Sequence, residues 1–421
     1  MKHLHQLTIA LIFLSFSAIA YSSNQVADDN DYILIKGRIL DQDDKTPLVF
    51  ASIALDGTNL ATVSNSEGRF SIKIPSKDRH RSLKISFLGY ISLLVPIDEL
   101  KEDKNNSLRM APYVVNLNTL DVFPNDPQII INNVLKNIPQ NYQQEAQLYT
   151  AFYRETIQKR RQYVALAESV LEINKPGALS PRSEQIRMLK GRKGVNVSKM
   201  DTILFKLQGG AYSMMSMDII KYPYELLTPE AQEQYDYKFE NITLINDEPH
   251  LILSFKPKGH IQLPLYYGKF YIHARTMAIA SARFQLNTSN PAMASKIFIK
   301  KKPMGCKVYP EYASYWVNYR QVDDRWYYSY ARGEVKFNIV WEKKLFRSQY
   351  TTSSELAVTD RKALESKTFK NNERLRKTAI MHEEVAGFYD EDFWGEYNLI
   401  EPEKSIRTAI KKIAKNIEKL E

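Results

Sequence analysis

Cysteine is nearly absent from this sequence, since Cys306 is the only one in 421 residues. A single cysteine excludes an intramolecular disulfide and any zinc site that needs several thiolates. Histidine is scarce as well, and none of the seven is followed by glutamate at the third position. The stretch Met381 to Glu384 begins like H-E-x-x-H, but Ala386 stands where the second histidine would be. We therefore predict no metal, no cofactor and a buried or idle thiol.

Motifs for covalent and nucleotide chemistry are also missing. The chain contains no G-x-S-x-G nucleophile elbow and no Walker-type lysine loop. The pair Gly209-Gly210 lacks a third glycine and is better explained as a tight turn. Glu168 and Glu172 lie four residues apart on an expected strand, which separates them by about 13 Å, too far for a glycosidase carboxylate pair. Carboxylates that converge from separate strands stay open as an alternative.

Only one long apolar run is present, and it lies at the N-terminus. Lys2 precedes the apolar stretch Leu7 to Phe16, and Ala18-Ile19-Ala20 follows as a small-x-small cleavage site. This order is typical of a signal peptide, so we predict that residues 1–20 are removed on export. A retained N-terminal anchor is the alternative. The scarcity of cysteine favours the periplasm or outer-membrane periphery of a Gram-negative bacterium over animal secretion.

Positive charge exceeds negative charge by ten, with 58 lysines and arginines against 48 acidic residues. The excess falls in small clusters such as Lys159-Arg160-Arg161 and Lys300-Lys301-Lys302. Such clusters permit peripheral contact with anionic lipid, although each cluster alone is best explained as a solvated turn. Because the chain carries an export signal, we exclude nucleic acid as a partner.

Short alternating apolar runs, separated by turn residues, fill residues 30–115. Examples are "YILIKGRIL", "LVFASIAL" and "GRFSIKI", each bounded by glycine, asparagine, aspartate or proline. Short strands at this spacing predict a β-sandwich. Gly57 and Gly68 fall in the turns, where glycine adopts a positive φ at low cost.

The turn Gly57-Thr58, the hairpin Glu67-Gly68-Arg69-Phe70 and the closing pair Gly89-Tyr90 form a pattern that resembles the carboxypeptidase-regulatory-like domain of Bacteroidetes envelope proteins. The resemblance implies a seven-stranded sandwich like that of transthyretin (prealbumin), used as a non-catalytic module. Despite the family name, the His-x-x-Glu ligand pair of a zinc carboxypeptidase is missing. One departure is Ala61, where the family often has glycine. The matching residues are Gly37, Asp41, Pro47, Leu48, Ala51, Ile53, Gly57, Thr58, Glu67, Gly68, Arg69, Phe70, Gly89 and Tyr90.

Residues 116–147 are predicted to form a linker and a helix. Asp126 is the expected N-cap, Pro127 the first helical residue, and Pro139 the end of the helix. The tyrosine-rich residues 148–360 then show hairpin patterns, which predict an antiparallel meander in one curved sheet resembling an open barrel.

Helical patterns interrupt and follow that sheet. Residues 200–235 are predicted to be a helical insertion that packs across the sheet and covers a groove. Residues 361–421 end in an amphipathic helix, which we expect to dock on its own domain rather than on a membrane. The fold class is therefore mainly β, with the sandwich followed by a larger α+β domain.

The second half also resembles that of a Bacteroidetes family carrying the same N-terminal module. The segments "FYRE", "LQGG", "IHARTMAI" and "FWGEYNLIEP" carry the resemblance. It implies no established activity. Its second domain is similar to the incomplete barrels of periplasmic lipoprotein carriers, which is an analogy of fold alone.

"FYRETI" is the polar cluster with the clearest candidate ligand group. On a strand, Tyr153 and Glu155 share one face and Arg154 lies on the other, so Arg154 and Glu155 cannot pair. The functional interpretation places Arg154 in a cavity for an anionic ligand, with Tyr153 nearby. The alternative is an arginine satisfied by a carboxylate of another strand.

Five aromatic residues complete the candidates. Tyr315, Trp316 and Trp326 are predicted to line a groove for apolar or carbohydrate partners, with ordinary sheet packing as the alternative. Phe393 and Trp394 are predicted to attach the C-terminal segment to the sheet.

The leading hypothesis is an exported, non-enzymatic envelope protein that binds a lipid, glycan or protein segment in the curved sheet, with the sandwich as docking module. One alternative is an envelope hydrolase, which requires titratable groups converging in one pocket. Another is an accessory subunit of an outer-membrane protein complex, which predicts an exposed apolar patch or a bare strand edge. The sequence leaves the oligomeric state open.

Overall fold

The computed structural model describes residues 32–113, 124–160, 162–195, 210–223, 226–259, 261, 263–298, 305–342, 347–364, 369–385 and 393–417. The predicted signal peptide, most of the predicted linker and the first part of the predicted helical insertion lie outside these residues. None of the helices among them is both long and apolar enough to cross a membrane.

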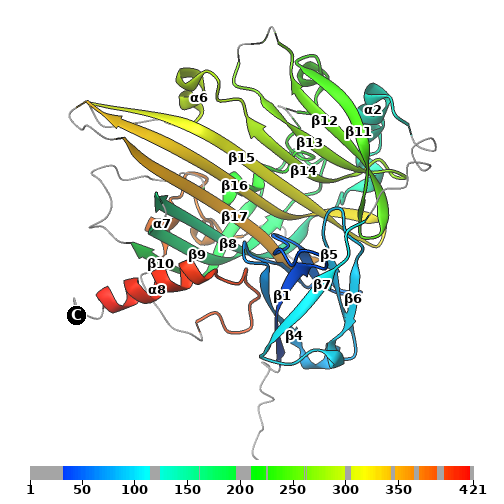
Figure 1. Ribbon diagram of the computed structural model, residues 1–421, viewed down its shortest axis with the longest axis vertical. Helices are drawn as coiled ribbons and strands as arrows, with labels where there is room; N and C mark the ends of the chain where they lie inside the picture. The colour runs from blue at the N-terminus through cyan, green and yellow to red at the C-terminus, as the bar shows by residue number, and fades with distance from the viewer. Residues whose placement is uncertain are drawn as a thin grey trace, which may run out of the picture.

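The N-terminal domain is a sandwich of two small sheets, ordered β4-β1-β7 and β3-β2-β5-β6 (Figure 1). Along β1 (Tyr32–Asp41) every second side chain is buried, so the alternation in the sequence becomes an inward-facing row. These rows form one apolar core, which confirms the predicted sandwich in its coarse form. The other strands are β2 (Ser52–Leu55), β3 (Ala61–Val63), β4 (Arg69–Pro75), β5 (Ser82–Ser86), β6 (Leu93–Pro96) and β7 (Asn105–Met110), with 3₁₀ helices at Ser76–Asp78 and Ile97–Glu99.

Two of the motif glycines are required by close packing. Gly37 on β1 faces the ring of Phe70, where an added Cβ would lie 2.5 Å from a ring carbon. Gly68 has a φ of +72°, and an added Cβ would lie 2.5 Å from the backbone oxygen of Ile39. Both positions therefore exclude any side chain unless the pairing of β1 with β4 is disturbed.

The remaining motif residues tie the sandwich to itself and to the second domain. In the Gly57-Thr58 turn, the threonine hydroxyl donates to a carbonyl oxygen of the preceding strand over 2.9 Å. The Tyr90 hydroxyl donates to the carboxylate of Asp41 over 2.7 Å. The N–H of Gly89 donates to the carbonyl oxygen of Leu244 in the second domain over 2.9 Å. The closing turn of the sandwich is therefore also a contact between the domains.

The second domain is built on one ten-stranded antiparallel sheet, ordered β10-β9-β8-β17-β16-β15-β14-β13-β12-β11. Strands β11 to β17 follow one another as the predicted meander does. The prediction is wrong between β10 and β11, which would be neighbours in a continuous meander but lie at opposite edges of the sheet, because the last strand, β17, pairs with β8. The bounds are β8 (Gln147–Lys159), β9 (Gln162–Lys175), β10 (Gln185–Val195), β11 (Tyr235–Ile245), β12 (Glu248–Pro257), β13 (Tyr266–His273), β14 (Ile279–Leu286), β15 (Cys306–Val322), β16 (Arg325–Trp341) and β17 (Ser348–Ala363).

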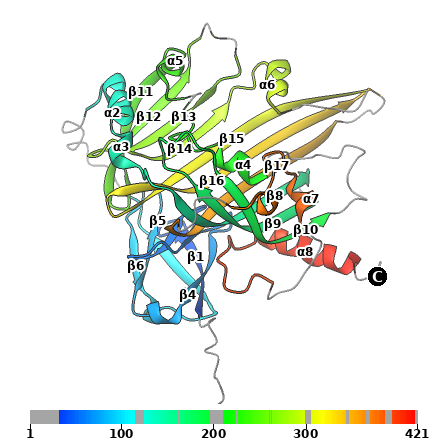
Figure 2. The same ribbon diagram turned by 180° about the vertical axis from the view of Figure 1, so that it is seen from behind.

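One face of this sheet, called the inner face below, curls around short helices (Figure 2). Ile186 on β10 and Leu251 on β12 belong to a single apolar cluster, although their strands lie near opposite edges of the sheet. Met214 of α4 and Ile130 of α2 lie in the same cluster, so side chains fill the space inside the curve. The helices are α2 (Pro127–Lys136), α3 (Ile138–Asn141), α4 (Gly210–Met215), α5 (Pro229–Gln232), α6 (Pro291–Phe298), α7 (Met381–Glu384) and α8 (Lys404–Ile417), with a 3₁₀ helix at Asn371–Glu373.

One local prediction is corrected at a helix boundary. The side chain of Asp126 caps α2 as predicted, by accepting from two backbone N–H groups, and Pro127 is the first helical residue. However, α2 ends at Lys136, and Pro139 lies at the start of α3, where a missing N–H costs nothing. Cys306 is buried at the first position of β15.

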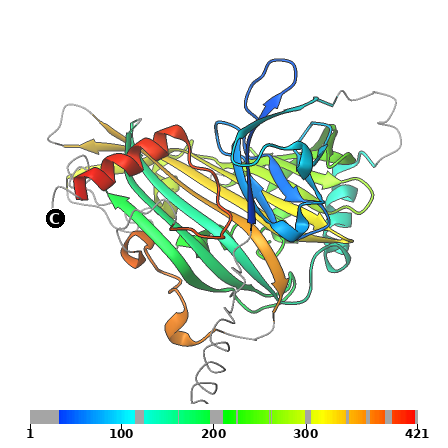
Figure 3. The ribbon, with the colours of Figure 1, turned by 90° about the horizontal axis from the view of Figure 1, so that it is seen from below.

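The sandwich and the C-terminal segment cover the opposite, outer face of the sheet (Figure 3). Phe50 of the sandwich and Trp394 of the C-terminal segment join one apolar cluster with Phe152 and Tyr330 of the sheet. The C-terminal segment also bonds to the sandwich, since Thr62 donates its hydroxyl to the carbonyl oxygen of Leu399 over 2.9 Å. The sandwich and the C-terminal segment thus share the outer face of the sheet, which also carries the site described next.

Candidate functional site

A row of charged side chains crosses the outer face at one register. Arg192 on β10 pairs with Glu168 on β9, and Glu168 pairs with Arg154 on β8. Across the next pairings Arg154 lies opposite Glu355 on β17, which lies opposite Arg332 on β16. These five residues, called the charge ladder below, alternate in sign over five neighbouring strands.

The side chains of the charge ladder are in direct contact. Arg154 donates through Nε to Glu168 over 2.7 Å and through Nη1 to Glu355 over 3.2 Å. Arg192 Nη2 lies 2.6 Å from the other oxygen of Glu168, and Arg332 Nη1 donates to Glu355 over 3.2 Å. Arg154, Glu168 and Glu355 are each at most 5% exposed, so the pairs are shielded from water. Arginine suits such pairs because its planar fork binds carboxylates through several donors.

The protonation equilibria of the charge ladder follow from this arrangement. Burial by itself would raise the pKa of Glu168, but the guanidinium groups of Arg154 and Arg192 outweigh it and hold that pKa below its ordinary value. Burial acts against the charge of Arg154 as well, yet Glu168 and Glu355 raise its pKa. Both partners therefore stay ionised near neutral pH.

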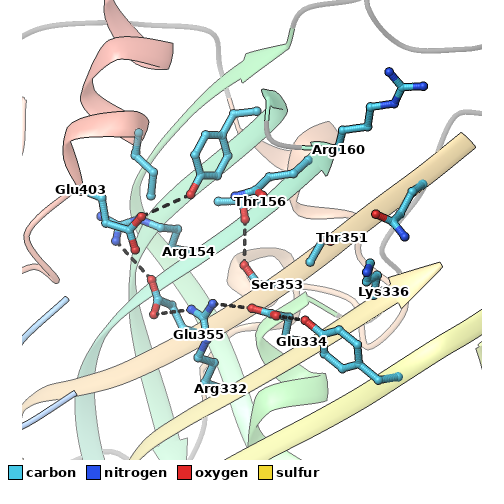
Figure 4. Close-up of a pocket in the computed structure, with 15 residues that line it drawn as sticks. Arg154, Thr156, Arg160, Arg332, Glu334, Lys336, Thr351, Ser353, Glu355 and Glu403 are labelled. Atoms are coloured by element: carbon cyan, nitrogen blue, oxygen red, sulfur yellow. Dashed lines mark hydrogen bonds and ion pairs between the residues drawn. The ribbon is translucent and has the colours of Figure 1, made fainter. Parts of the chain in front are cut away.

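A cavity of about 410 Å³ opens on the outer face beside the charge ladder (Figure 4). Strands β8, β15, β16 and β17 form its floor, and Tyr163 of β9 with the beginning of α8 forms one side. The lining residues are Arg154, Thr156, Gln158, Arg160, Tyr163, Tyr312, Arg332, Glu334, Lys336, Gln349, Thr351, Ser353, Glu355, Glu403 and Ile406.

Most of the charges around this cavity are already compensated within the protein. Glu334 accepts from Arg332 over 2.8 Å and from the hydroxyl of Tyr312. Lys336 donates to Glu311 over 3.0 Å, outside the set of lining residues. What the floor offers besides these pairs is hydroxyl and amide groups, which both donate and accept hydrogen bonds.

The structure does not gather the five predicted ligand-binding residues into one site. Arg154 lines the cavity, but it is paired with carboxylates of two other strands, as the alternative interpretation held. Trp316 also lies on the outer face, next to Arg332 in the register and 5.3 Å from the ring of Phe50. Trp316 lines a second, smaller cavity together with Phe50 and Tyr330, but Tyr315 and Trp326 do not line it, so these three residues do not form the predicted groove.

The other three predicted residues face the opposite side of the sheet. Tyr153 is fully buried and donates to Glu155 over 2.7 Å, as expected for two residues on one face. Trp326 is buried in the inner-face cluster beside His250, and Tyr315 packs against that same cluster. These three belong to the packing of the inner face.

The C-terminal aromatic residues lie where the sequence predicts them. Trp394 packs edge-on against Phe152 with ring centroids 5.8 Å apart, and the guanidinium of Arg192 stacks over its ring. Lys190 of β10 donates to the carbonyl oxygen of Phe393 over 3.0 Å. Ile406 at the start of α8 is buried, and α8 packs against β9 and β10, which favours docking on its own domain.

Sequence reasoning missed most of the site, namely Arg332, Glu355, Tyr312, Thr351 and Glu403. Glu355 and Arg154 are 201 residues apart, and no local pattern brings β17 next to β8. The strand itself gave no signal, because the residues between Thr351, Ser353 and Glu355 are Thr352 and Ser354, so polar and apolar positions do not alternate there.

The described residues contain no group of three or more histidine, cysteine, aspartate or glutamate side chains that could hold a metal ion. His250 and His273 do lie side by side, with ring centroids 5.1 Å apart. Burial lowers the pKa of His250 to about 3, and it lowers the pKa of His273 as well. The pair is therefore a neutral part of the inner-face packing.

Comparison with known proteins identifies a family for the sandwich only. Residues 35–122 match the family model described as CarboxypepD_reg-like domain, which is about a fifth of the chain. A search of curated proteins finds no match.

Several solved structures share a weak similarity with a little more than half of the chain. A domain from Vibrio parahaemolyticus named for outer membrane lipoprotein sorting is 10% identical, with a TM-score of 0.26, over 59% of this chain and 96% of that one. A DUF1329 family protein from Desulfovibrio piger is 11% identical, with a TM-score of 0.21, over 56% and 94%. A LolA superfamily protein from Nitrosomonas europaea is 11% identical, with a TM-score of 0.19, over 58% and 98%. At these TM-scores the similarity does not define a common fold.

Proposed function

We propose that this protein is an exported, non-enzymatic binding protein of the Bacteroidetes cell envelope whose outer-face cavity holds a glycan. The observation that carries the proposal is the cavity of about 410 Å³ with a polar floor and internally paired charges. Its volume lies in the ordinary range of small-molecule sites. The sandwich serves as the docking module and also covers part of the same face.

The lining favours a sugar over an acyl chain. An acyl chain gains its binding energy from apolar contact, and Ile406 is the only aliphatic residue among the described lining residues. Thr156, Thr351 and Ser353 instead present hydroxyl groups on the floor (Figure 4). Hydroxyl groups of the ligand can replace water on such side chains in both the donor and the acceptor role.

The paired state of the carboxylates supports binding rather than hydrolysis. A glycosidase needs one carboxyl group that stays protonated to act as general acid. Glu334 and Glu355 both form ion pairs with Arg332, at 2.8 Å and 3.2 Å, and Glu403 accepts from the hydroxyl of Tyr163 over 3.4 Å, so each lining carboxylate already has a partner within the protein. Export is inferred from the sequence of residues 1–20, with its single lysine, apolar run and small-x-small site.

The test is an array of soluble oligosaccharides probed with the purified, fluorescently labelled chain. Thr351 on β17 lines the cavity, so Thr351→Tyr fills part of it and should weaken binding at least about tenfold. Thr46→Tyr, in an exposed turn of the sandwich, makes the same change away from the cavity and should leave binding unaltered. Absence of any bound sugar, or equal binding by Thr351→Tyr, would reject the proposal. Binding of a fluorescent fatty acid instead would transfer the function to a lipid.

A further inference from the structure

Beyond β16 the alternation of charge across the outer face breaks. Trp316 on β15 lies opposite Arg332, and Arg283 on β14 lies opposite Trp316. The next charged position after an arginine of the charge ladder is therefore a second arginine, with an aromatic ring between them. The guanidinium of Arg283 stacks on that ring, 3.8 Å from its centroid.

Arg283 has no carboxylate partner of the kind that each arginine of the charge ladder has. Its Nε and Nη2 are buried and have no hydrogen-bond partner, and no carboxylate of the described residues forms an ion pair with it. Burial lowers the pKa of Arg283, because removing a positive charge from water disfavours the charged form. A buried arginine whose N–H donors have no acceptor lowers the stability of the fold unless a ligand supplies the acceptors.

The side chain of Arg283 lines a cavity of about 70 Å³ between the two domains, which shares no lining residue with the outer-face cavity. The sandwich contributes Ser86 and Phe87, the turn between β11 and β12 contributes Asn246, and the sheet contributes Arg283 and Arg320. No acidic side chain of the described part of the chain lines it. The volume exceeds what one water molecule needs and suits a group of a few heavy atoms.

Arg320 adds a second positive charge to this cavity. Its Nη1 and Nη2 donate to the backbone oxygens of Leu60 and Asn59 in the sandwich, so its position is fixed. Burial lowers its pKa to about 10, and the nearby Arg361 contributes in the same direction. Asp360 acts on Arg320 with an opposite charge, but no carboxylate of the described residues forms an ion pair with Arg283 or Arg320. Two guanidinium groups without an ion-pair partner match a ligand that carries negative charge.

We propose that this interdomain cavity binds a phosphate group, held by the guanidinium fork of Arg283 and the charge of Arg320. A phosphate carries about −1.5 to −2 at neutral pH, and its oxygens accept from an arginine fork in a bidentate manner. The group belongs either to free phosphate or to the phosphomonoester of a larger molecule. In both cases it joins the sandwich to the sheet, because residues of both domains line the cavity.

The experiment is isothermal titration calorimetry of the full chain with inorganic phosphate and, separately, with glycerol 3-phosphate, in chloride buffer at constant ionic strength. We expect one bound ligand per chain. Arg283→Met keeps an apolar stem on the ring of Trp316 but removes the donors, and should weaken binding at least about tenfold. Arg182→Met removes an exposed arginine far along the sequence from the cavity and should change nothing.

A second variant keeps the proposal testable if Arg283→Met does not fold. Ser86→Asp places a carboxylate in the cavity wall, so it should abolish phosphate binding and raise the Tm of the phosphate-free protein. Binding of free phosphate alone would identify the ion as the ligand, and equal or tighter binding of glycerol 3-phosphate would identify a phosphomonoester. No binding of either probe by the unaltered chain, or unchanged binding by Ser86→Asp, would overturn the proposal.

Discussion

Removal of Arg154 tests whether the charge ladder stabilises the outer face. Arg154→Met keeps much of the side-chain volume but leaves Glu168 and Glu355 buried, at 1% and 5% exposure, each with one arginine instead of two. It also removes the 2.7 Å hydrogen bond from Arg154 to the carbonyl oxygen of Ile400 in the C-terminal segment. Removing one partner of a buried ion pair costs about 3–5 kcal/mol. Since each carboxylate keeps one arginine, we expect about 3 kcal/mol.

The loss of unfolding free energy in Arg154→Met should depend on pH, and the pKa of Glu168 sets the direction of this dependence. In the folded protein this pKa lies below its unfolded value, so the stabilisation is complete above the unfolded value of about 4.3 and disappears as the pH falls through the folded value. In the Arg154→Met variant only Arg192 remains to counteract the rise that burial causes in the pKa of Glu168. Glu168 should therefore take up a proton at a higher pH than in the unaltered protein. Protonation relieves the buried charge, and the difference between the two proteins should shrink below about pH 5.

Urea unfolding followed by tryptophan fluorescence, at pH 7 and pH 4, measures both effects. The matched control is Arg187→Met on β10, because Arg187 pairs with Glu172 while 33% exposed, and exposed pairs contribute about 1 kcal/mol or less. A loss below about 1 kcal/mol at pH 7, equal to that of the control, would refute the reasoning. So would a difference that grows on acidification.

Two further predictions concern the inner face and the sandwich. The pKa of His250 is about 3 in the folded protein, against about 6.5 in the unfolded chain. Its ring signals in NMR spectra should therefore not titrate between pH 8 and pH 5, and His250 should lower the free energy of unfolding progressively below pH 6.5. A titration midpoint near pH 6.5 would contradict the burial of this ring. Gly68→Ala places a Cβ within 2.5 Å of the backbone oxygen of Ile39 at a φ of +72°, so it should lower the free energy of unfolding by more than about 1 kcal/mol. In the control Gly259→Ala the new Cβ meets nothing within 4 Å, so the free energy of unfolding should change by no more than about 0.5 kcal/mol. Equal urea midpoints for the two variants would contradict the steric argument.

The sandwich and the single hairpins could be predicted from the sequence because their signals are local. The alternation in Tyr32–Asp41 depends only on which side chains are apolar, and the turn at Gly68 depends on one residue that accepts a positive φ. Asp126 followed by Pro127 defines a helix start for the same reason. Alternation even separates Arg154 from Glu155, which the structure shows with different partners.

The site depends on pairings that no local pattern contains. Arg154 meets Glu355 only because β17 returns to lie beside β8, and a shift of that pairing by one residue would turn every side chain of β17 to the other face. The same is true of Arg283, whose missing counter-charge becomes apparent only when Trp316 is placed opposite it. The sequence by itself indicated the strands, their turns and, within a regular strand, which side chains share a face. Only the tertiary structure decided which faces meet, because strand order and register are set by burial summed over the whole sheet rather than by neighbours along the chain.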